Sequence, residues 1–149
     1  MSIYKNLLLR YNMKIGMICG CFDMFHIGHL NILEKCKQNC DYLLVGVCND
    51  AYIRTKKQKE PMIHEENRLR IIKALKCVDD AVLVCLEEIQ DKIALSTKYN
   101  VSVVFDGDDW KDDERYKKLK QAGIEVKFFP YTQGISSTQL REKLNEKPL

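Results

Sequence analysis

The chain has 149 residues, of which 46% are hydrophobic and 30% charged, a composition typical of one water-exposed globular domain. Its net charge of +3 is too small to indicate nucleic-acid binding, although it is compatible with a site for a small anion. No apolar run approaches the roughly 20 residues of a membrane-spanning helix, and the amino terminus lacks a signal-peptide cleavage site. We therefore expect a cytoplasmic protein without membrane insertion.

The elements expected along the chain are strands alternating with helices. The strands are residues 14–19, 42–47, 81–86, 101–106 and 124–129, and the helices are residues 28–39, 65–76, 88–99, 112–122 and 137–145. Because the strands are apolar along nearly their whole length, both faces of the sheet should be covered. The pattern predicts a Rossmann-like, doubly wound α/β domain with a five-stranded parallel sheet and helices on both faces. We assign residues 13–149 to this domain and residues 1–12 to an amino-terminal extension of unassigned role.

Cysteine usage indicates free thiols. Seven cysteines form no C-x-x-C pair and no regular framework, which favours a reducing compartment. Cys36 and Cys40 lie four residues apart on an expected helix, but no matching second pair accompanies them, so we predict no metal site there.

Polar motifs follow four of the expected strands. They are G-C-F-D-M-F-H-I-G-H after the first strand, N-D-A-Y after the second, D-G-D-D-W at the fourth and P-Y-T-Q-G-I-S-S-T after the fifth. Ligands of doubly wound domains bind beyond the carboxyl ends of the strands, near the switch in strand order. The motifs should therefore meet in one site.

The first motif, from Gly20 to His29, suits phosphate binding. Gly28 lies where the helix should begin, and a helix amino terminus offers free N–H groups and a partial positive charge to an anion. His26 and His29 would add side-chain donors on the same turn. Two alternatives remain open from these residues alone: a capped helix with two hydrogen-bonded histidines, or a zinc site completed by Asp23 or Cys21. Zinc-binding histidines on a helix are usually four residues apart, so the zinc site ranks below phosphate.

The motifs also resemble those of a known family. G-C-F-D-M-F-H-I-G-H resembles the signature of the H-x-G-H nucleotidyltransferase superfamily, and Y-T-Q-G-I-S-S-T resembles the second signature of its cytidylyltransferase branch, usually R-T-x-G-I-S-T-T. G-D-D-W, together with K-Q-K before an arginine-bearing helix, is similar to glycerol-3-phosphate cytidylyltransferases. The resemblance spans residues 13–144. It implies a homodimeric enzyme that transfers CMP from CTP to a small phosphorylated alcohol, foremost glycerol 3-phosphate, and so makes a precursor of a cell-envelope polymer.

The resemblance further implies site residues. The catalytic group comprises His26, His29, Lys57 and Arg68. The nucleotide would be bound by Gly20, Cys21, Phe22, Asp23, His26, Gly28, His29, Asp109, Thr132, Gly134, Ile135, Ser136 and Ser137. The acceptor would be bound by Asp50, Lys57, Lys59, Lys76 and Trp110. Mg²⁺ would be bound through the phosphates of CTP, and no protein ligand is assigned to it.

Local structure also accounts for parts of these motifs. S-S-T-Q is a helix capping box beginning at Ser136, the lysine run of residues 56–59 is typical of a solvated loop, and D-G is a turn signal. Tyr131 stands where the family usually has arginine, and the loop before Arg68 is one residue longer than expected. Threonine is frequent in the family at the position of Cys21. A cysteine there, in G-C-F-D, is similar to the ethanolamine-phosphate and heptose-phosphate branches. Three kinds of alternative therefore remain. The first is a different acceptor, namely another polyol phosphate, ethanolamine phosphate or heptose phosphate. The others are adenylyl transfer in place of cytidylyl transfer, and a nucleotide-binding sensor without turnover.

Overall fold

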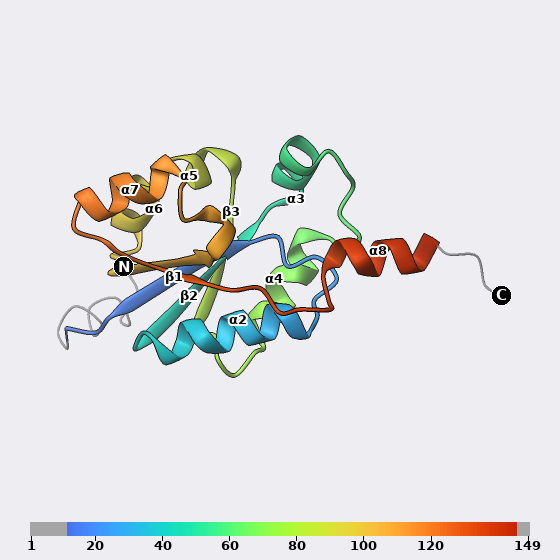
Figure 1. The fold of residues 1–149 in the computed structure, drawn as a ribbon, viewed down its shortest axis with the longest axis horizontal. Coiled ribbons are helices and arrows are strands. Elements are labelled where there is room, and N and C mark those ends of the chain that lie inside the picture. Colours follow the sequence, from blue (N-terminus) through green and yellow to red (C-terminus); the bar gives the residue numbers. More distant parts are fainter. Residues whose placement is uncertain (1–11, 146–149) are drawn as a thin grey trace.

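Five parallel strands form the centre of the fold in the computed structural model, which describes residues 12–145 (Figure 1). They are β1 (Ile15–Gly20), β2 (Tyr42–Cys48), β3 (Asp80–Val84), β4 (Val103–Gly107) and β5 (Glu125–Phe129). The order in the sheet is β3-β2-β1-β4-β5, with every neighbouring pair parallel. The switch in strand order thus falls between β1 and β4, and the predicted doubly wound sheet is confirmed.

Helices cover both faces of this sheet. Helices α2 (Ile27–Gln38) and α4 (Glu65–Lys73) lie on one face, below the sheet in Figure 1. Helices α5 (Leu86–Gln90), α6 (Lys92–Lys98) and α7 (Glu114–Gln121) lie on the other. Alternating residues of β1 enter the two cores, since Ile18 is buried with Leu33 of α2 and Met17 with Leu119 of α7. Burial on both faces explains why the strands are apolar along nearly their whole length.

The helix expected over residues 88–99 is two helices that meet at Asp91. Asp91 has a non-helical backbone, and its carboxylate accepts the Ala94 N–H at 3.0 Å and so caps α6. At the start of α5, Glu88 accepts the Cys85 N–H at 3.0 Å. That cap also ends β3 at Val84, earlier than the predicted residue 86.

Three short helical segments follow strands at the carboxyl edge and were not expected. After β2 come α3 (Asp50–Tyr52) and a π-helical turn, η1 (Ile53–Lys57), which carries the first lysines of the lysine run. After β4 comes a 3₁₀ turn, η2 (Asp108–Trp110), formed by D-D-W. All three lie at the edge of the sheet where the sequence motifs converge.

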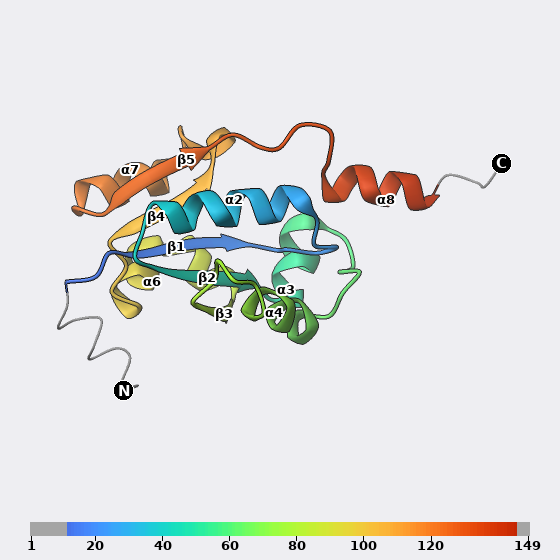
Figure 2. The same cartoon turned by 90° about the horizontal axis from the view of Figure 1, so that it is seen from below.

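The last helix, α8 (Ser137–Asn145), projects beyond the end of the sheet (Figure 2). Ser136 Oγ accepts the Gln139 N–H at 3.1 Å, which confirms the predicted cap. The predicted extension, residues 1–12, lies outside the described residues except for Asn12. Within residues 12–145, every helix is too short or too polar to cross a lipid bilayer.

Candidate active site

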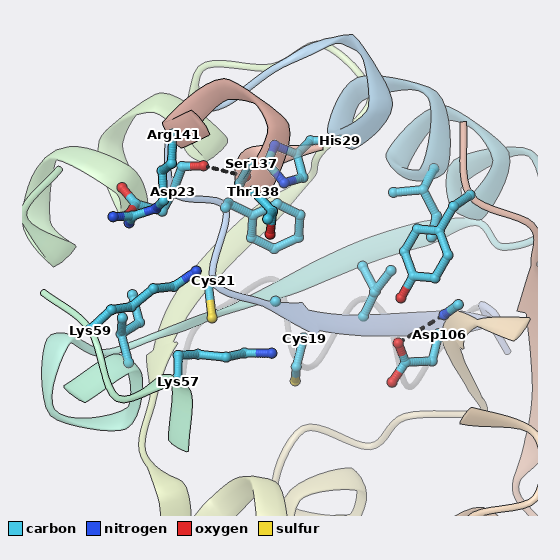
Figure 3. Close-up of a pocket in the computed structure, with 17 residues that line it drawn as sticks. Cys19, Cys21, Asp23, His29, Lys57, Lys59, Asp106, Ser137, Thr138 and Arg141 are labelled. Carbon is cyan, nitrogen blue, oxygen red and sulfur yellow. Dashed lines mark hydrogen bonds and ion pairs between the residues drawn. The ribbon is translucent and has the colours of Figure 1, made fainter. Parts of the chain in front are cut away.

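Two adjoining cavities open at the carboxyl ends of the strands, where the predicted motifs meet. The larger, about 290 Å³, lies beyond β1 and β4 and is called here the large chamber (Figure 3). The smaller, about 170 Å³, lies toward α6 and α7 and is called the small chamber. The two chambers share a wall formed by Cys19, Gly20, Cys21, Lys57, Asp106 and Tyr131.

The two motif histidines cap helix α2 reciprocally. His26 is the N-cap, and its Nδ1 accepts the Gly28 N–H at 3.0 Å, while the Nδ1 of His29 accepts the His26 N–H at 3.2 Å. The rings stack with centroids 3.8 Å apart. His29 lines the large chamber, whereas His26 does not line it and packs against the His29 ring. A Cβ on Gly28 would lie 2.8 Å from Cε1 of His26, so glycine is needed at this position.

This arrangement fixes how the histidines can act. Burial lowers the pKa of His29 to about 4 and lowers the pKa of His26 as well, so both rings are neutral at physiological pH. Because each Nδ1 accepts a backbone hydrogen, the proton of each neutral ring is on Nε2. Each ring therefore presents an Nε2–H donor. The predicted capped helix and the predicted donor role are compatible.

The loop between β1 and α2 has a constrained backbone. Phe22 and Met24 both have φ of +51°, a left-handed conformation that is uncommon for residues other than glycine. A Cβ on Gly20 would lie 2.9 Å from the Phe22 ring, so glycine lets that ring fold back over the end of β1. Phe22 is buried and also forms part of the wall of the large chamber.

Asp23 joins three segments around the large chamber. Its carboxylate accepts the backbone N–H groups of Met62 at 2.8 Å and Ile63 at 2.9 Å, and it pairs with Arg141 of α8 at 2.6 Å. The Asp23 carbonyl also accepts the Ser137 hydroxyl at 2.9 Å. Because both carboxylate oxygens are occupied, Asp23 organises the chamber and is not a free ligand for a cation.

Lys57 and Lys59 reach the site from the segment after β2. Both line the large chamber, and Lys57 also lines the small one. Figure 3 shows the two side chains extending from the same side toward Cys19 and Cys21. Lys57 is exposed at the last position of η1, and Gln58, with φ of +53°, turns the chain before Lys59. Two of the predicted phosphate-binding cations are thus brought together.

Arg68 lies behind the site, not in it. Its side chain is fully buried, and Nη1 donates to the carbonyl oxygens of Cys21 at 2.6 Å and Cys48 at 2.7 Å. Nη2 donates to Asp50 at 2.7 Å and Nε to the Ile63 carbonyl at 2.8 Å. Arg68, predicted as catalytic, and Asp50, predicted to bind the acceptor, line neither chamber, so the structure gives both a positioning role at the ends of β1 and β2.

The segment before α8 closes the site from the β5 side. Thr132 Oγ1 accepts from the Asn31 amide at 3.1 Å, and the φ of Gly134, +82°, turns the chain toward the helix. The Ile135 side chain lies close to Gly28. Tyr131 of this segment lines the large chamber, as do Ser137, Thr138 and Arg141 of α8. The predicted nucleotide-binding residues Thr132, Gly134, Ile135 and Ser136 do not line it.

Tyr131, which replaces the usual arginine, lies over the end of β4. A Cβ on Gly107 would clash with the Tyr131 ring, so that glycine makes room for it. Burial, together with the negative charge of the nearby Asp109, raises the pKa of the Tyr131 hydroxyl. Asp109 itself lines neither chamber, whereas Trp110 lines the small one.

One predicted residue lies elsewhere, and others were missed. Lys76 lies in the turn before β3, at the amino ends of the strands, whereas both chambers open at the carboxyl ends. It lines neither chamber, so its predicted place in the acceptor site is wrong. The small chamber is also lined by Lys92 and Arg115, which lie outside the motifs, and by Tyr52 of N-D-A-Y, which had been assigned no role. Lys92 begins α6 at the unexpected break at Asp91, so no sequence pattern pointed to it.

The donor set does not form a protein metal centre. Within residues 12–145, no cluster of three or more His, Cys, Asp or Glu side chains is arranged to hold a metal ion. The Nδ1 atoms of His26 and His29 and the carboxylate of Asp23 accept hydrogen bonds within the chain, and the Nε2 atoms of the two rings carry protons, so these groups present no free lone pair to zinc. The phosphate-binding interpretation of the histidine motif is therefore the better supported of the two.

Comparison with known proteins places this site in a family. A family model described as cytidylyltransferase-like matches residues 17–143. The chain is 33% identical over 132 residues to the glycerol-3-phosphate cytidylyltransferase of Bacillus spizizenii, covering 89% of this chain and 98% of that protein. It is 32% identical over 140 residues to the bifunctional protein HldE of Rhodopseudomonas palustris, covering 92% of this chain but only 28% of that longer protein.

Solved structures of other proteins have a similar fold. A lipopolysaccharide core biosynthesis protein from Thermoplasma volcanium superposes with a TM-score of 0.66 at 32% identity, over 80% of this chain and 97% of that one. A pantoate-beta-alanine ligase from Francisella tularensis, at 14% identity and a TM-score of 0.67, shares the fold over 93% of this chain and 69% of that one. The doubly wound domain and the histidine-capped helix at its switch point define a nucleotidyltransferase of the H-x-G-H class. Within that class, the chain belongs to the cytidylyltransferase-like family.

Proposed function

We propose that this protein transfers CMP from CTP to the phosphate of a small phosphorylated alcohol, foremost glycerol 3-phosphate, and releases pyrophosphate. The observation that carries the proposal is the pair of adjoining chambers, which share Lys57 and the β1 end at Gly20 and Cys21. The larger one suits the nucleotide and the smaller one the acceptor. Two substrates seated this way would meet at the shared wall.

Groups that suit a triphosphate gather around the large chamber. His29 presents its Nε2–H, and Ser137 and Thr138 lie in the first turn of α8, whose N–H groups favour anions. Lys57, Lys59 and Arg141 supply positive charge. The Nε of Arg141 is buried without a hydrogen-bond partner among the described residues, so it has a donor available for an anion.

The transfer requires no general base. A phosphomonoester has a second pKa near 6 and is mostly dianionic at neutral pH. Its oxygen forms a bond to the α-phosphorus of CTP while the bond from that phosphorus to the bridging oxygen breaks, and pyrophosphate leaves with the electron pair. The chain's part is to align the substrates and to stabilise the charge that develops on the phosphoryl oxygens. Lys57, at the shared wall, and His29 are placed for this role.

We propose that Mg²⁺ enters with CTP. When bound, Mg²⁺ neutralises charge on the triphosphate and on the departing pyrophosphate. Asp23 is fully engaged by Met62, Ile63 and Arg141, and Asp106 is hydrogen-bonded to Tyr116. Because these two carboxylates are already hydrogen-bonded, the residues present fit a Mg²⁺ ion that is bound by the phosphates of CTP.

Lys92 supports an acceptor with a neutral polar end. It is 8% exposed and lines the small chamber, and it has no salt bridge to another described residue. Its Nζ lies 4.9 Å from the centroid of the Tyr116 ring. An ammonium group donates hydrogen bonds to hydroxyl groups and repels a second ammonium. The small chamber therefore favours glycerol 3-phosphate over ethanolamine phosphate.

A pyrophosphate-release screen tests this proposal. The four ribonucleoside triphosphates would be crossed, with Mg²⁺, against glycerol 3-phosphate, a second polyol phosphate, ethanolamine phosphate and heptose phosphate. We expect the highest kcat/KM with CTP and glycerol 3-phosphate. Preference for heptose phosphate, which the resemblance at Cys21 makes the second candidate, or for ATP would move the protein to another branch. If no pair releases pyrophosphate, the catalytic proposal is wrong and a nucleotide-binding sensor replaces it.

The resemblance also supports a homodimer. Light scattering coupled to size-exclusion chromatography would test this, since the dimer has twice the 17.4 kDa mass of the chain.

A further inference from the structure

Cys21 and Cys48 are neighbours at the ends of adjacent strands. In the parallel pairing of β1 with β2, Cys19 is opposite Gly46 and Gly20 opposite Val47, so Cys21 and Cys48 come next in register. Both side chains lie on the α5–α7 face of the sheet. Adjacent strands are about 4.8 Å apart, within the Cα separation of about 4.4–6.8 Å that a disulfide requires.

The backbones of this pair are held together by Arg68. A single guanidinium nitrogen, Nη1, donates to the carbonyl oxygens of both Cys21 and Cys48, at 2.6 and 2.7 Å. Because the Arg68 side chain is fully buried and paired with Asp50, this clamp is fixed. The separation between the backbones of Cys21 and Cys48 is thus fixed by a buried side chain.

The two thiols have different surroundings. Cys21 lines both chambers, whereas Cys48 is 3% exposed and borders only the small one. A hydrogen bond from Cys48, followed by the charges of Lys57, Arg68 and Lys59, lowers the pKa of Cys21 to about 7 despite its burial. The same hydrogen bond raises the pKa of Cys48. A reachable thiol with thiolate character beside a second thiol is the arrangement found in redox-sensitive sites.

We propose that Cys21 and Cys48 form a reversible oxidation site, at which hydrogen peroxide converts the two thiols into a disulfide. The Cys21 thiolate attacks one peroxide oxygen and the O–O bond breaks. The departing hydroxide takes up a proton and leaves as water, and Cys21 becomes a sulfenic acid. The Cys48 sulfur then attacks the Cys21 sulfur, loses its proton, and displaces the sulfenic hydroxyl as a second water. Two thiols are oxidised, and one peroxide is reduced to two waters.

Cys19 is not part of this site. Its neighbour in register is Gly46, which offers no thiol, and burial raises its pKa to about 11. It lines the same two chambers as Cys21, so it experiences similar access to a small oxidant. Cys19 is therefore the matched control for the pair.

The test follows the covalent state of the chain by mass. The full-length protein would be treated with hydrogen peroxide, alkylated under denaturing conditions and analysed by non-reducing peptide mapping. We expect the free thiols to fall from seven by two, with one linked peptide pair joining Cys21 and Cys48. Dithiothreitol should restore all seven. These readouts do not depend on catalysis, so they stay informative even if the proposed function is wrong.

Single variants separate the steps. Cys19→Ser should form the same disulfide, and Cys21→Ser should form none. Cys48→Ser should stop at the sulfenic acid on Cys21, which dimedone labels. The proposal is wrong if the wild-type chain keeps seven free thiols, or if its disulfide maps to other cysteines; these two results do not require any variant to fold. In the wild type, any transferase activity should fall with disulfide formation and return on reduction, because both sulfurs border the small chamber.

Discussion

Replacing Arg68 with alanine should destabilise the fold strongly, because this residue holds the strand ends beneath the site. The substitution removes hydrogen bonds to Cys21, Cys48 and Ile63. It leaves the buried Asp50 carboxylate with one side-chain partner among the described residues, the exposed His64 at 2.8 Å. Removing one partner of a buried ion pair typically costs about 3–5 kcal/mol. Against the roughly 5–15 kcal/mol that stabilises a domain of ordinary size, such a loss is large.

Urea denaturation followed by circular dichroism measures this loss. With a slope of about 2 kcal/mol per molar urea, the midpoint should fall by about 2 M. Arg70→Ala on the same helix is the matched control, because Arg70 is exposed; its effect should stay within about 0.5 kcal/mol. Arg68→Lys should recover only part of the loss, since an ammonium cannot reproduce the planar guanidinium fork.

The alternative is that Arg68 contacts substrate directly. In that case Arg68→Ala would unfold at nearly the same urea concentration as Arg70→Ala while losing transferase activity. That pair of results would refute the positioning role that the buried geometry assigns to Arg68.

Three further predictions concern the chambers. His26→Ala and His29→Ala should each lower kcat by about 10²–10³, the usual effect of one lost donor to a transition state, and near-normal turnover in both would contradict the donor assignment. Because the pKa of folded His29 is about 4 against 6.5 unfolded, the unfolded state binds more protons between these values. The His29 contribution to the unfolding free energy should therefore fall as pH drops from about 6.5 to about 4, and His29→Gln should flatten that part of the urea-derived pH profile. Lys92→Met should reduce the preference for glycerol 3-phosphate over ethanolamine phosphate by about tenfold or more, whereas Lys118→Met, at an exposed position, should not; equal ratios of kcat/KM in both variants would count against the acceptor assignment.

The sequence predicted what depends on local pattern. Strand positions followed from apolar runs buried on both faces, and the cap at Ser136 followed from its own spacing to Gln139. The edge of the sheet that carries the site followed from where the polar motifs fall relative to the strands. Each of these is a short-range property of the chain.

What the sequence did not predict depends on contacts between distant residues. Arg68 and Asp50 are 18 residues apart, and only the folded chain shows that they bind each other, with Arg68 facing carbonyl groups in place of a phosphate. Lys92 enters the small chamber because Asp91 ends one helix and caps the next, a break hidden inside a continuous helical pattern. Only the family resemblance assigned Lys76 to the acceptor site. Because Lys76 precedes β3, it lies at the amino ends of the strands, away from the chambers.

The contacts of Asp23 have a mechanical consequence for two borders of the large chamber. One carboxylate holds the backbone at Met62 and Ile63, just after the lysine run, and also Arg141 of α8. The segment after the lysine run and helix α8 are thus attached to the same side chain, and a displacement of either would stretch its hydrogen bonds to Asp23. Asp23→Ala would therefore remove both attachments at once.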